Sequence, residues 1–292
     1  MKLKTLQVVL LLFFFSSSCQ ADLLVNQYNT NLHDRFSNSS QFIGNPYDWS
    51  GVGKRVSGPG PFTGRWATMV SDSFGLAVNH ASPEVGSTVR FYHSNDPAGS
   101  FEDRVVAQTF SYGSADLRLI RFATAVSANV EKYTLYDTPA SGAAGLDLKV
   151  FGLASANDFA PETRVRLGTN TADGVLPAGQ ISGINYDSLL FDYDTSEGQG
   201  EARVAGGDSG APSFVIENNT PLLIGLHNFQ YTADDGSTGS GDIFLPSYID
   251  AINDDLAGFG ESLSVFSVPE PTSGALIGIG LIGLLIRRNR RA

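Results

Sequence analysis

Short apolar runs separated by turn-forming residues dominate this chain and favour a β fold. Several of them recur with no long helical stretch between them: 67–70, 148–153, 189–191 and 222–226. The chain has 32 glycines, and its turns are also rich in serine and asparagine. Only 246–256 has helical spacing, with Leu245, Ile249, Ile252 and Leu256 on one face. We therefore predict an all-β protein with one short C-terminal helix.

The stretch Gly207-Asp208-Ser209-Gly210-Ala211-Pro212 places a hydroxyl group inside a glycine turn. Glycines on both sides allow positive φ angles and a close approach to a substrate. The N–H groups of Gly207 and Ser209 can therefore converge on a developing oxyanion, as acyl transfer requires. Read alone, Gly-Asp-Ser-Gly is also often a polar turn that caps its own backbone. The stretch indicates a nucleophile only if a base and a carboxylate accompany it.

A histidine and an aspartate stand upstream at two predicted strand ends. A serine hydroxyl needs an imidazole that can take its proton. His80 follows the apolar run 75–78 and precedes Pro83, so we expect it at the end of a buried strand. Asp116 enters a second apolar run, 117–122, where a carboxylate usually has a partner. Both partners of a serine nucleophile are therefore present.

The segments around these three residues, in the order His, Asp, Ser, resemble those of trypsin-like (chymotrypsin-fold) serine peptidases. The resemblance implies that His80 is the general base, Asp116 its orienting carboxylate and Ser209 the nucleophile. It also implies an oxyanion hole formed by the amides of Gly207 and Ser209. The fold it implies is two packed six-stranded antiparallel β-barrels, the first over about 45–135 and the second over about 136–258, with the helix last.

The chain also departs from that family. Ala81 stands where the family usually has cysteine, and Ala211 replaces a usual glycine. The family's disulfides are missing, because Cys19 is the only cysteine and lies in the export signal. Arg203 occupies the position that in trypsin carries a carboxylate for basic substrates, so trypsin-type specificity is not expected.

A histidine downstream of the nucleophile is the candidate specificity residue. His227 ends Leu223-Ile224-Gly225-Leu226-His227, which resembles the Ile-Gly-Ile-His stretch of bacterial glutamyl endopeptidases. The resemblance implies that His227, helped by Arg203, binds an acidic substrate side chain. The alternative is a strand histidine whose ring is satisfied within the protein.

Other site types have less support in the sequence. The α/β-hydrolase elbow needs Gly-x-Ser-x-Gly and a later histidine, whereas Ala211 breaks that pattern. No metal-binding motif is present, so we expect no metal and no cofactor. The acidic segment 234–242 reads as a solvated hairpin, with a weak calcium loop as the alternative. Lys54-Arg55-Val56 invites comparison with zymogen activation, but a hairpin is favoured, with Asp208 finding another partner.

The two ends of the chain predict export. Residues 1–21 carry two lysines, an apolar core and small residues at the end, as in a secretory signal peptide. The domain then spans 22–266. Residues 267–292 carry Val-Pro-Glu-Pro, an apolar stretch over 272–286 and an arginine cluster, and they resemble the bacterial PEP-CTERM sorting signal. The resemblance implies recognition by an exosortase, with the tail as a transient membrane anchor or, alternatively, a permanent one. We expect a location in the cell envelope, at the cell surface or in the extracellular matrix.

The net charge limits the classes of molecule that the domain is expected to bind. The full chain carries a formal net charge of −11, and six of its 19 lysines and arginines lie in the two signals, so the domain between them is more acidic still. Nucleic acid and anionic membrane surfaces are therefore disfavoured as partners of the domain. The sequence predicts an exported serine endopeptidase that acts on protein or peptide substrates. The alternative is a catalytically silent trypsin-like domain that serves as a surface or matrix binding protein.

Overall fold

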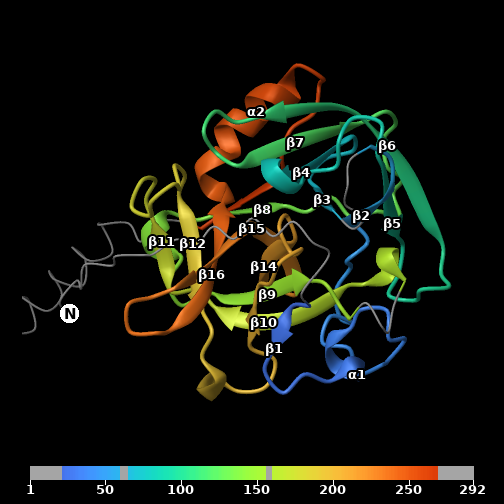
Figure 1. Cartoon of the computed structure of the whole chain (residues 1–292). Helices are drawn as coiled ribbons and strands as arrows, with labels where there is room; N and C mark the ends of the chain where they lie inside the picture. The colour runs from blue at the N-terminus through green and yellow to red at the C-terminus, as the bar shows by residue number, and fades with distance from the viewer. Residues whose placement is uncertain (1–21, 60–64, 156–159, 269–292) are drawn as a thin grey trace, which may run out of the picture.

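The computed structural model describes residues 22–59, 65–155 and 160–268, which form a closed barrel and a large sheet (Figure 1). The predicted signal peptide and the apolar stretch 272–286 lie outside these residues. Within the described part the chain is mostly β, as predicted from its short apolar runs. The predicted short C-terminal helix is confirmed as α2 (Ile249–Ala257).

Six strands close into an antiparallel barrel in the order β2-β3-β4-β7-β6-β5. They are β2 (Val52–Ser57), β3 (Trp66–Met69), β4 (Phe74–Val78), β5 (Thr88–Tyr92), β6 (Phe101–Ser111) and β7 (Leu117–Phe122). Small and large apolar side chains fill its interior, including Ala67, Ala77, Phe91 and Phe122. Strands β4 and β7 pair with Val78 opposite Leu117. This register brings the residues after β4 to the same end of the barrel as those before β7.

Nine strands form the second sheet. They are β8 (Leu135–Asp137), β9 (Asp147–Gly152), β10 (Arg166–Thr171), β11 (Gly174–Leu176), β12 (Ser188–Asp192), β14 (Pro212–Glu217), β15 (Thr220–Thr232), β16 (Thr238–Phe244) and β17 (Val265–Ser267). The main path runs β10-β9-β14-β15-β16-β12-β11, and β8 pairs with both β15 and β17. The pairs between described strands leave this path open at β10 and β11. A second closed six-stranded barrel therefore stays a prediction.

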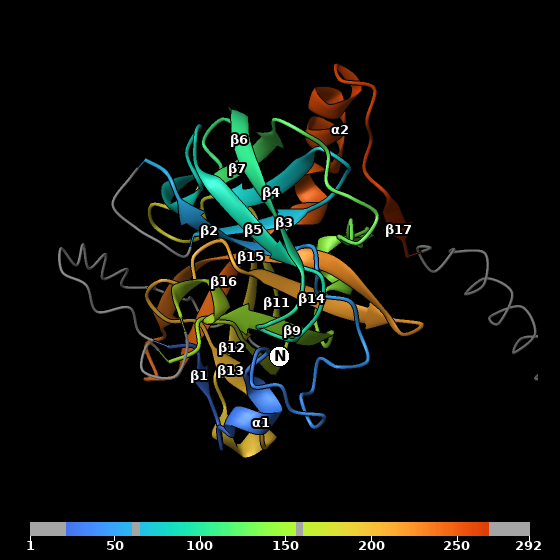
Figure 2. The same ribbon diagram turned by 90° about the vertical axis from the view of Figure 1, so that its right-hand side faces the viewer.

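A shared aromatic core joins the barrel and the sheet, which lie one above the other in Figure 2. Trp49, just before β2, has its ring 4.9 Å from that of Phe151 on β9 and 5.2 Å from that of Phe214 on β14. All three side chains are fully or almost fully buried. Rings at these tilted or edge-on separations add to the stabilisation from apolar burial. This core holds the two halves in one arrangement.

The helix begins later than the sequence predicts. Pro246 lies in a 3₁₀ turn, η5 (Leu245–Tyr248), and α2 starts at Ile249. Leu245, Ile252 and Leu256 are fully buried, so the predicted apolar face covers the core across both elements. Pro246 has no N–H for an α-helical hydrogen bond, which suits the first turn of such a segment.

The N-terminal segment packs on the large sheet. Leu23 is fully buried, and β1 (Leu24–Val25) pairs with β13 (Ala202–Arg203). One helical turn, α1 (Thr30–His33), follows. Arg166 Nε on β10 then donates to the buried carboxylate of Asp34 over 2.8 Å. These contacts fasten the first described residues to strands that occur much later in the chain.

The segment that contains Lys54 forms β2, one of the six strands of the closed barrel. Lys54 on β2 is buried, and its ammonium donates to the carbonyl oxygens of Pro161 and Arg164 at 2.7 and 2.8 Å. Burial, reinforced by the charge of Arg164, lowers the pKa of Lys54 to about 7. Strand β2 pairs antiparallel with β3 and β5, so residues 54–57 form part of the barrel wall.

Candidate active site

His80 and Asp116 meet at one end of the barrel. The backbone N–H of His80 donates to Asp116 Oδ1 over 2.8 Å, and the ring Nδ1 is in hydrogen-bonding contact with Asp116 Oδ2. The N–H of Asn79 also donates to the Asp116 carbonyl oxygen over 2.7 Å. The pairing of β4 with β7 is thus continued by one carboxylate that holds both the main chain and the ring of His80. With Nδ1 on the carboxylate, Nε2 is the nitrogen left to accept a proton.

The carboxylate of Asp116 is held in its ionised form. Partial burial acts to raise its pKa, but hydrogen bonds and charge interaction with His80, together with a bond from Asn228, outweigh burial and lower the pKa. A carboxylate that stays ionised orients the imidazole and favours its positive form. His80 keeps 45% of its side chain exposed, which leaves the ring accessible from solvent.

Asn228 is a site residue that the sequence did not reveal. Its Nδ2 donates to Asp116 Oδ2 over 2.8 Å, and its Oδ1 accepts a hydrogen bond from the Tyr186 hydroxyl. The pairing of β15 with β16 shifts register between His227 and Phe229. Asn228 lies at this irregularity, and its side chain reaches from the large sheet to Asp116 of the barrel. A one-residue shift in register has no sequence signature, so neither composition nor residue spacing could indicate the role of Asn228.

Ser209 lies in a turn with the expected glycine conformations. Gly207 and Gly210 have φ angles of 105° and 85°, in the region that favours glycine. The N–H of Ala211 donates to the Asp208 carbonyl oxygen over 2.8 Å and closes the turn. The amides of Gly207 and Ser209 donate to no acceptor among the described residues. Their role as an oxyanion hole stays a prediction.

The Ser209 turn lies against the strand that leads to His80. A Cβ atom placed on Gly210 would be 3.4 Å from the backbone nitrogen of Val78, the last residue of β4. The Ser209 side chain is partly exposed. Among the described residues no hydrogen bond joins its hydroxyl to His80. Catalytic hydrogen bonds are often long without a substrate and shorten in the complex.

Asp208 finds its partners inside the large sheet. Its carboxylate accepts from the backbone N–H groups of Leu153 and Ala205, each over 2.7 Å. The residue is fully buried, and burial raises its pKa to about 6 in spite of these two bonds. The bond from Leu153 anchors the start of the Ser209 turn to the residue that follows β9, and the bond from Ala205 closes the local loop.

The two predicted specificity residues have separate surroundings. His227 is fully buried, and both ring nitrogens bond within the protein, to Asp242 and to the Phe151 carbonyl oxygen. Arg203 lies on β13 and stacks over the Tyr193 ring at 5.8 Å. Among the described residues no hydrogen bond or ion pair joins Arg203 to His227. The structure therefore matches the alternative of a histidine satisfied within the protein, and acidic specificity stays a prediction.

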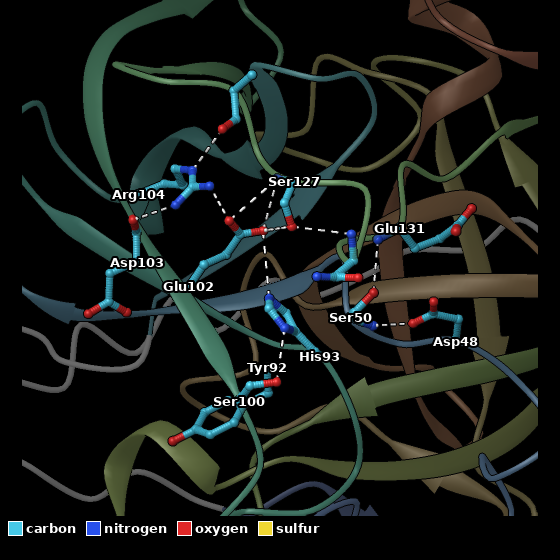
Figure 3. Close-up of polar contacts among 12 residues, drawn as sticks. Asp48, Ser50, Tyr92, His93, Ser100, Glu102, Asp103, Arg104, Ser127 and Glu131 are labelled. Carbon is cyan, nitrogen blue, oxygen red and sulfur yellow. Dashed lines mark hydrogen bonds and ion pairs between the residues drawn. The ribbon is translucent and has the colours of Figure 1, made fainter.

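A second grouping of serine, histidine and carboxylate lies on the β5–β6 hairpin (Figure 3). His93 Nδ1 is 3.1 Å from Ser100 Oγ, and its Nε2 is 3.8 Å from Glu102 Oε1. Glu102 is already bonded to Arg104 and to the N–H and hydroxyl of Ser127. Glu102 therefore links the hairpin to the loop after β7 that contains Ser127, which we call the 127 loop. Gly99 precedes Ser100 in a turn closed by its N–H on the Asp96 carbonyl oxygen, but it lacks the positive φ angle of Gly207 and Gly210, so this group reads as a structural cross-link.

The acidic segment 234–242 forms the end of the β15–β16 hairpin. Asp235 Oδ1 accepts from the N–H and the hydroxyl of Ser237 at 3.1 and 2.7 Å. Asp242 lies on β16 opposite His227. No helix within the described ranges is long and apolar enough to cross a membrane.

Comparison with known proteins assigns the C-terminal end. The PEP-CTERM protein-sorting motif matches residues 267–291. No curated protein matches the chain. The motif indicates an exported protein that associates with the cell envelope and is processed by exosortase and the export machinery.

Proposed function

We propose that this protein is an exported serine endopeptidase that forms an acyl-enzyme on Ser209. One observation carries the proposal. The carboxylate of Asp116 accepts a hydrogen bond from the backbone N–H of His80 and is also in hydrogen-bonding contact with Nδ1 of its ring. This contact occurs beside a glycine turn in which the amides of Gly207 and Ser209 have no acceptor among the described residues. An oriented imidazole, an ionised carboxylate, a serine hydroxyl and two unused amides are the groups that acyl transfer needs.

The chemistry follows from these positions. The Ser209 hydroxyl oxygen attacks the carbonyl carbon of the peptide, and its proton passes to Nε2 of His80. The negative charge on the carbonyl oxygen is stabilised by the N–H groups of Gly207 and Ser209. Protonated His80, stabilised by Asp116, then gives its proton to the leaving amine as the peptide C–N bond breaks. A water molecule, deprotonated by His80, attacks the ester and releases the acid and Ser209.

The fold supports the same proposal. His80 and Asp116 border β4 and β7 of the closed barrel, whereas Ser209 precedes β14 of the large sheet. We infer that the large sheet is the counterpart of the second barrel of trypsin-like peptidases. The nucleophile and its base would then come from different halves and meet at their junction.

One observation favours the alternative, a catalytically silent domain that binds at the cell surface. The Ser209 hydroxyl has no hydrogen bond to His80. The two functions differ in whether the hydroxyl reacts. A fluorophosphonate probe reacts with activated serines and forms a stable phosphonyl ester, so it reports the nucleophile without knowledge of the substrate.

The experiment compares wild type with two serine variants. We expect labelling of Ser209 in the wild type and none in Ser209→Ala, because only the activated hydroxyl reacts. Ser100→Ala is the matched control, since Ser100 also contacts a histidine but lies on the β5–β6 hairpin. It should be labelled as the wild type is. A folded wild type that resists the probe would support the silent domain.

A further inference from the structure

His227 lies directly behind the nucleophile turn. The N–H of Gly210 donates to the His227 carbonyl oxygen over 2.8 Å, and the N–H of His227 donates to the Ala211 carbonyl oxygen over 2.9 Å. The two residues that follow Ser209 are therefore both hydrogen-bonded to one residue of β15. Any shift of His227 moves the chain that presents the Ser209 hydroxyl.

The ring of His227 contacts an oxygen acceptor at each nitrogen. Nδ1 is 2.6 Å from Asp242 Oδ1, and Nε2 is 2.7 Å from the Phe151 carbonyl oxygen. A carbonyl oxygen only accepts, so Nε2 carries a proton. With a second proton on Nδ1, the ring can also donate to the Asp242 carboxylate. The contacts therefore fit an imidazolium that donates from both nitrogens, and both residues are fully buried.

The surroundings favour that positive ring. Burial acts to lower the pKa of His227, but the charge and hydrogen bond of Asp242, followed by the charge of Asp208, outweigh burial and raise the pKa. Two basic groups act on this cluster through Asp208: the charge of Arg166 works to lower the pKa of Asp208, and the buried Lys54 also interacts with the Asp208 charge. The pair itself is neutral overall, and its two bonds leave the ring one orientation.

We infer that His227 and Asp242 form a buried positioning pair that holds the Ser209 turn, and that His227 does not touch the substrate. This inference rests on the proposed peptidase function. The ring spans from β16, through Asp242, to the carbonyl oxygen of Phe151 on β9. The ring thereby links β15, β16 and β9 next to the hydrogen bonds that join Gly210 and Ala211 to β15. A smaller side chain would release this brace while leaving His80 and Asp116 in the barrel.

The proton state is tested by nitrogen NMR on the purified wild-type protein with ¹⁵N-labelled histidine. The chain has four histidines, and His227 is assigned by its loss in His227→Ala or, if that variant does not fold, by exclusion with variants of the other three. We expect both ring nitrogens of His227 to carry protons from about pH 6 to pH 8, across which an ordinary imidazole loses one. A ring with one unprotonated nitrogen throughout this range overturns the pair.

The positioning role is tested by kinetics. We expect His227→Ala to lower kcat on the order of 10²-fold, because misplacing a reacting group by about 1 Å has that effect. KM and the preferred side chain before the cleaved bond should not change. His33→Ala is the matched control, since His33 is also buried but lies in α1 of the N-terminal segment. It should keep the wild-type kcat in the folded protein.

Asp242→Asn is the conservative variant and does not depend on His227→Ala folding. Its amide can donate to Nδ1 of a neutral ring while Nε2 still donates to the Phe151 carbonyl oxygen. The brace is then kept without the charge, so kcat should stay within a few-fold of wild type. A large kcat loss in this variant with the fold intact contradicts positioning by hydrogen bonding.

The remaining outcomes separate the inference from the proposed function. A library of peptides in which His227→Ala raises KM or erases a preference for Glu or Asp shows that the ring contacts substrate, and overturns the inference. A labelled wild type with an unchanged kcat in His227→Ala also overturns it alone. A wild type that the fluorophosphonate probe does not label overturns the proposed function, and the inference with it.

Discussion

Asp208 should make the stability of this protein fall as pH rises from about 4 to 6. The carboxylate is fully buried, and its pKa is raised from 3.8 to about 6. Between these values the folded protein keeps the proton that the unfolded chain releases. The stabilising contribution of the protonated group is therefore complete below about pH 4 and lost as pH passes 6. This direction is opposite to that of a salt-bridged aspartate.

The size of the effect follows from the shift. About two pKa units at 1.36 kcal/mol per unit correspond to about 3 kcal/mol of unfolding free energy. No reduction for solvent screening applies, because the side chain is fully buried. Asp173, whose pKa burial and Asp192 raise to about 6, contributes in the same direction. A difference between two variants is therefore the sharper measurement.

The assay is urea unfolding of wild type and Asp208→Asn at several pH values from 4 to 8. The amide loses the bond from Ala205 at all pH values, which sets a constant offset. On top of that offset, the wild type should lose about 3 kcal/mol relative to the variant as pH rises. Asp254→Asn, an exposed carboxylate on α2, is the control and should show no such trend. A pH-independent difference between wild type and Asp208→Asn refutes the reasoning.

Three further perturbations test the remaining contacts. Asp116→Asn should keep KM and lose kcat by about 10⁴-fold near neutral pH, because an amide favours the wrong tautomer of His80; a change of a few-fold would mean that another group orients the ring. Asn228→Ala should lower kcat by roughly tenfold or more through the lost charge-assisted bond to Asp116, measured beside Asn129→Ala on the 127 loop as control. Arg166→Met should cost about 3–5 kcal/mol of unfolding free energy, because it removes the guanidinium that balances the charge of the buried Asp34 carboxylate; wild-type stability would contradict this.

The strand ends that carry the candidate site could be predicted from sequence because apolar runs end abruptly there. The expected runs became β4, which ends at Val78, and β7, which begins at Leu117. Their pairing then brings His80 and Asp116 into contact. The glycine turn was also readable, since glycine is the residue that positive φ angles favour.

The predicted runs 148–153, 189–191 and 222–226 overlap β9, β12 and β15 of the large sheet, but the shortest strands and the long-range contacts could not be predicted in the same way. Strands β1 and β13 have two residues each, and β8 and β17 have three, which is too short for any periodic pattern. The role of Asn228 depends on a register shift that leaves no trace in composition. The environment of His227 depends on Phe151 and Asp242, which lie 76 residues before it and 15 after it. Such contacts arise only when the fold is complete.

The sorting motif begins inside strand β17 of the folded domain. The motif begins at residue 267, yet Ser267 is still paired with Asp137, and the N–H of Val268 donates to the Asp137 carbonyl oxygen over 3.0 Å. The folded domain therefore continues into the motif without a spacer. The first two residues of the motif can therefore leave the folded domain only if the end of β17 separates from β8.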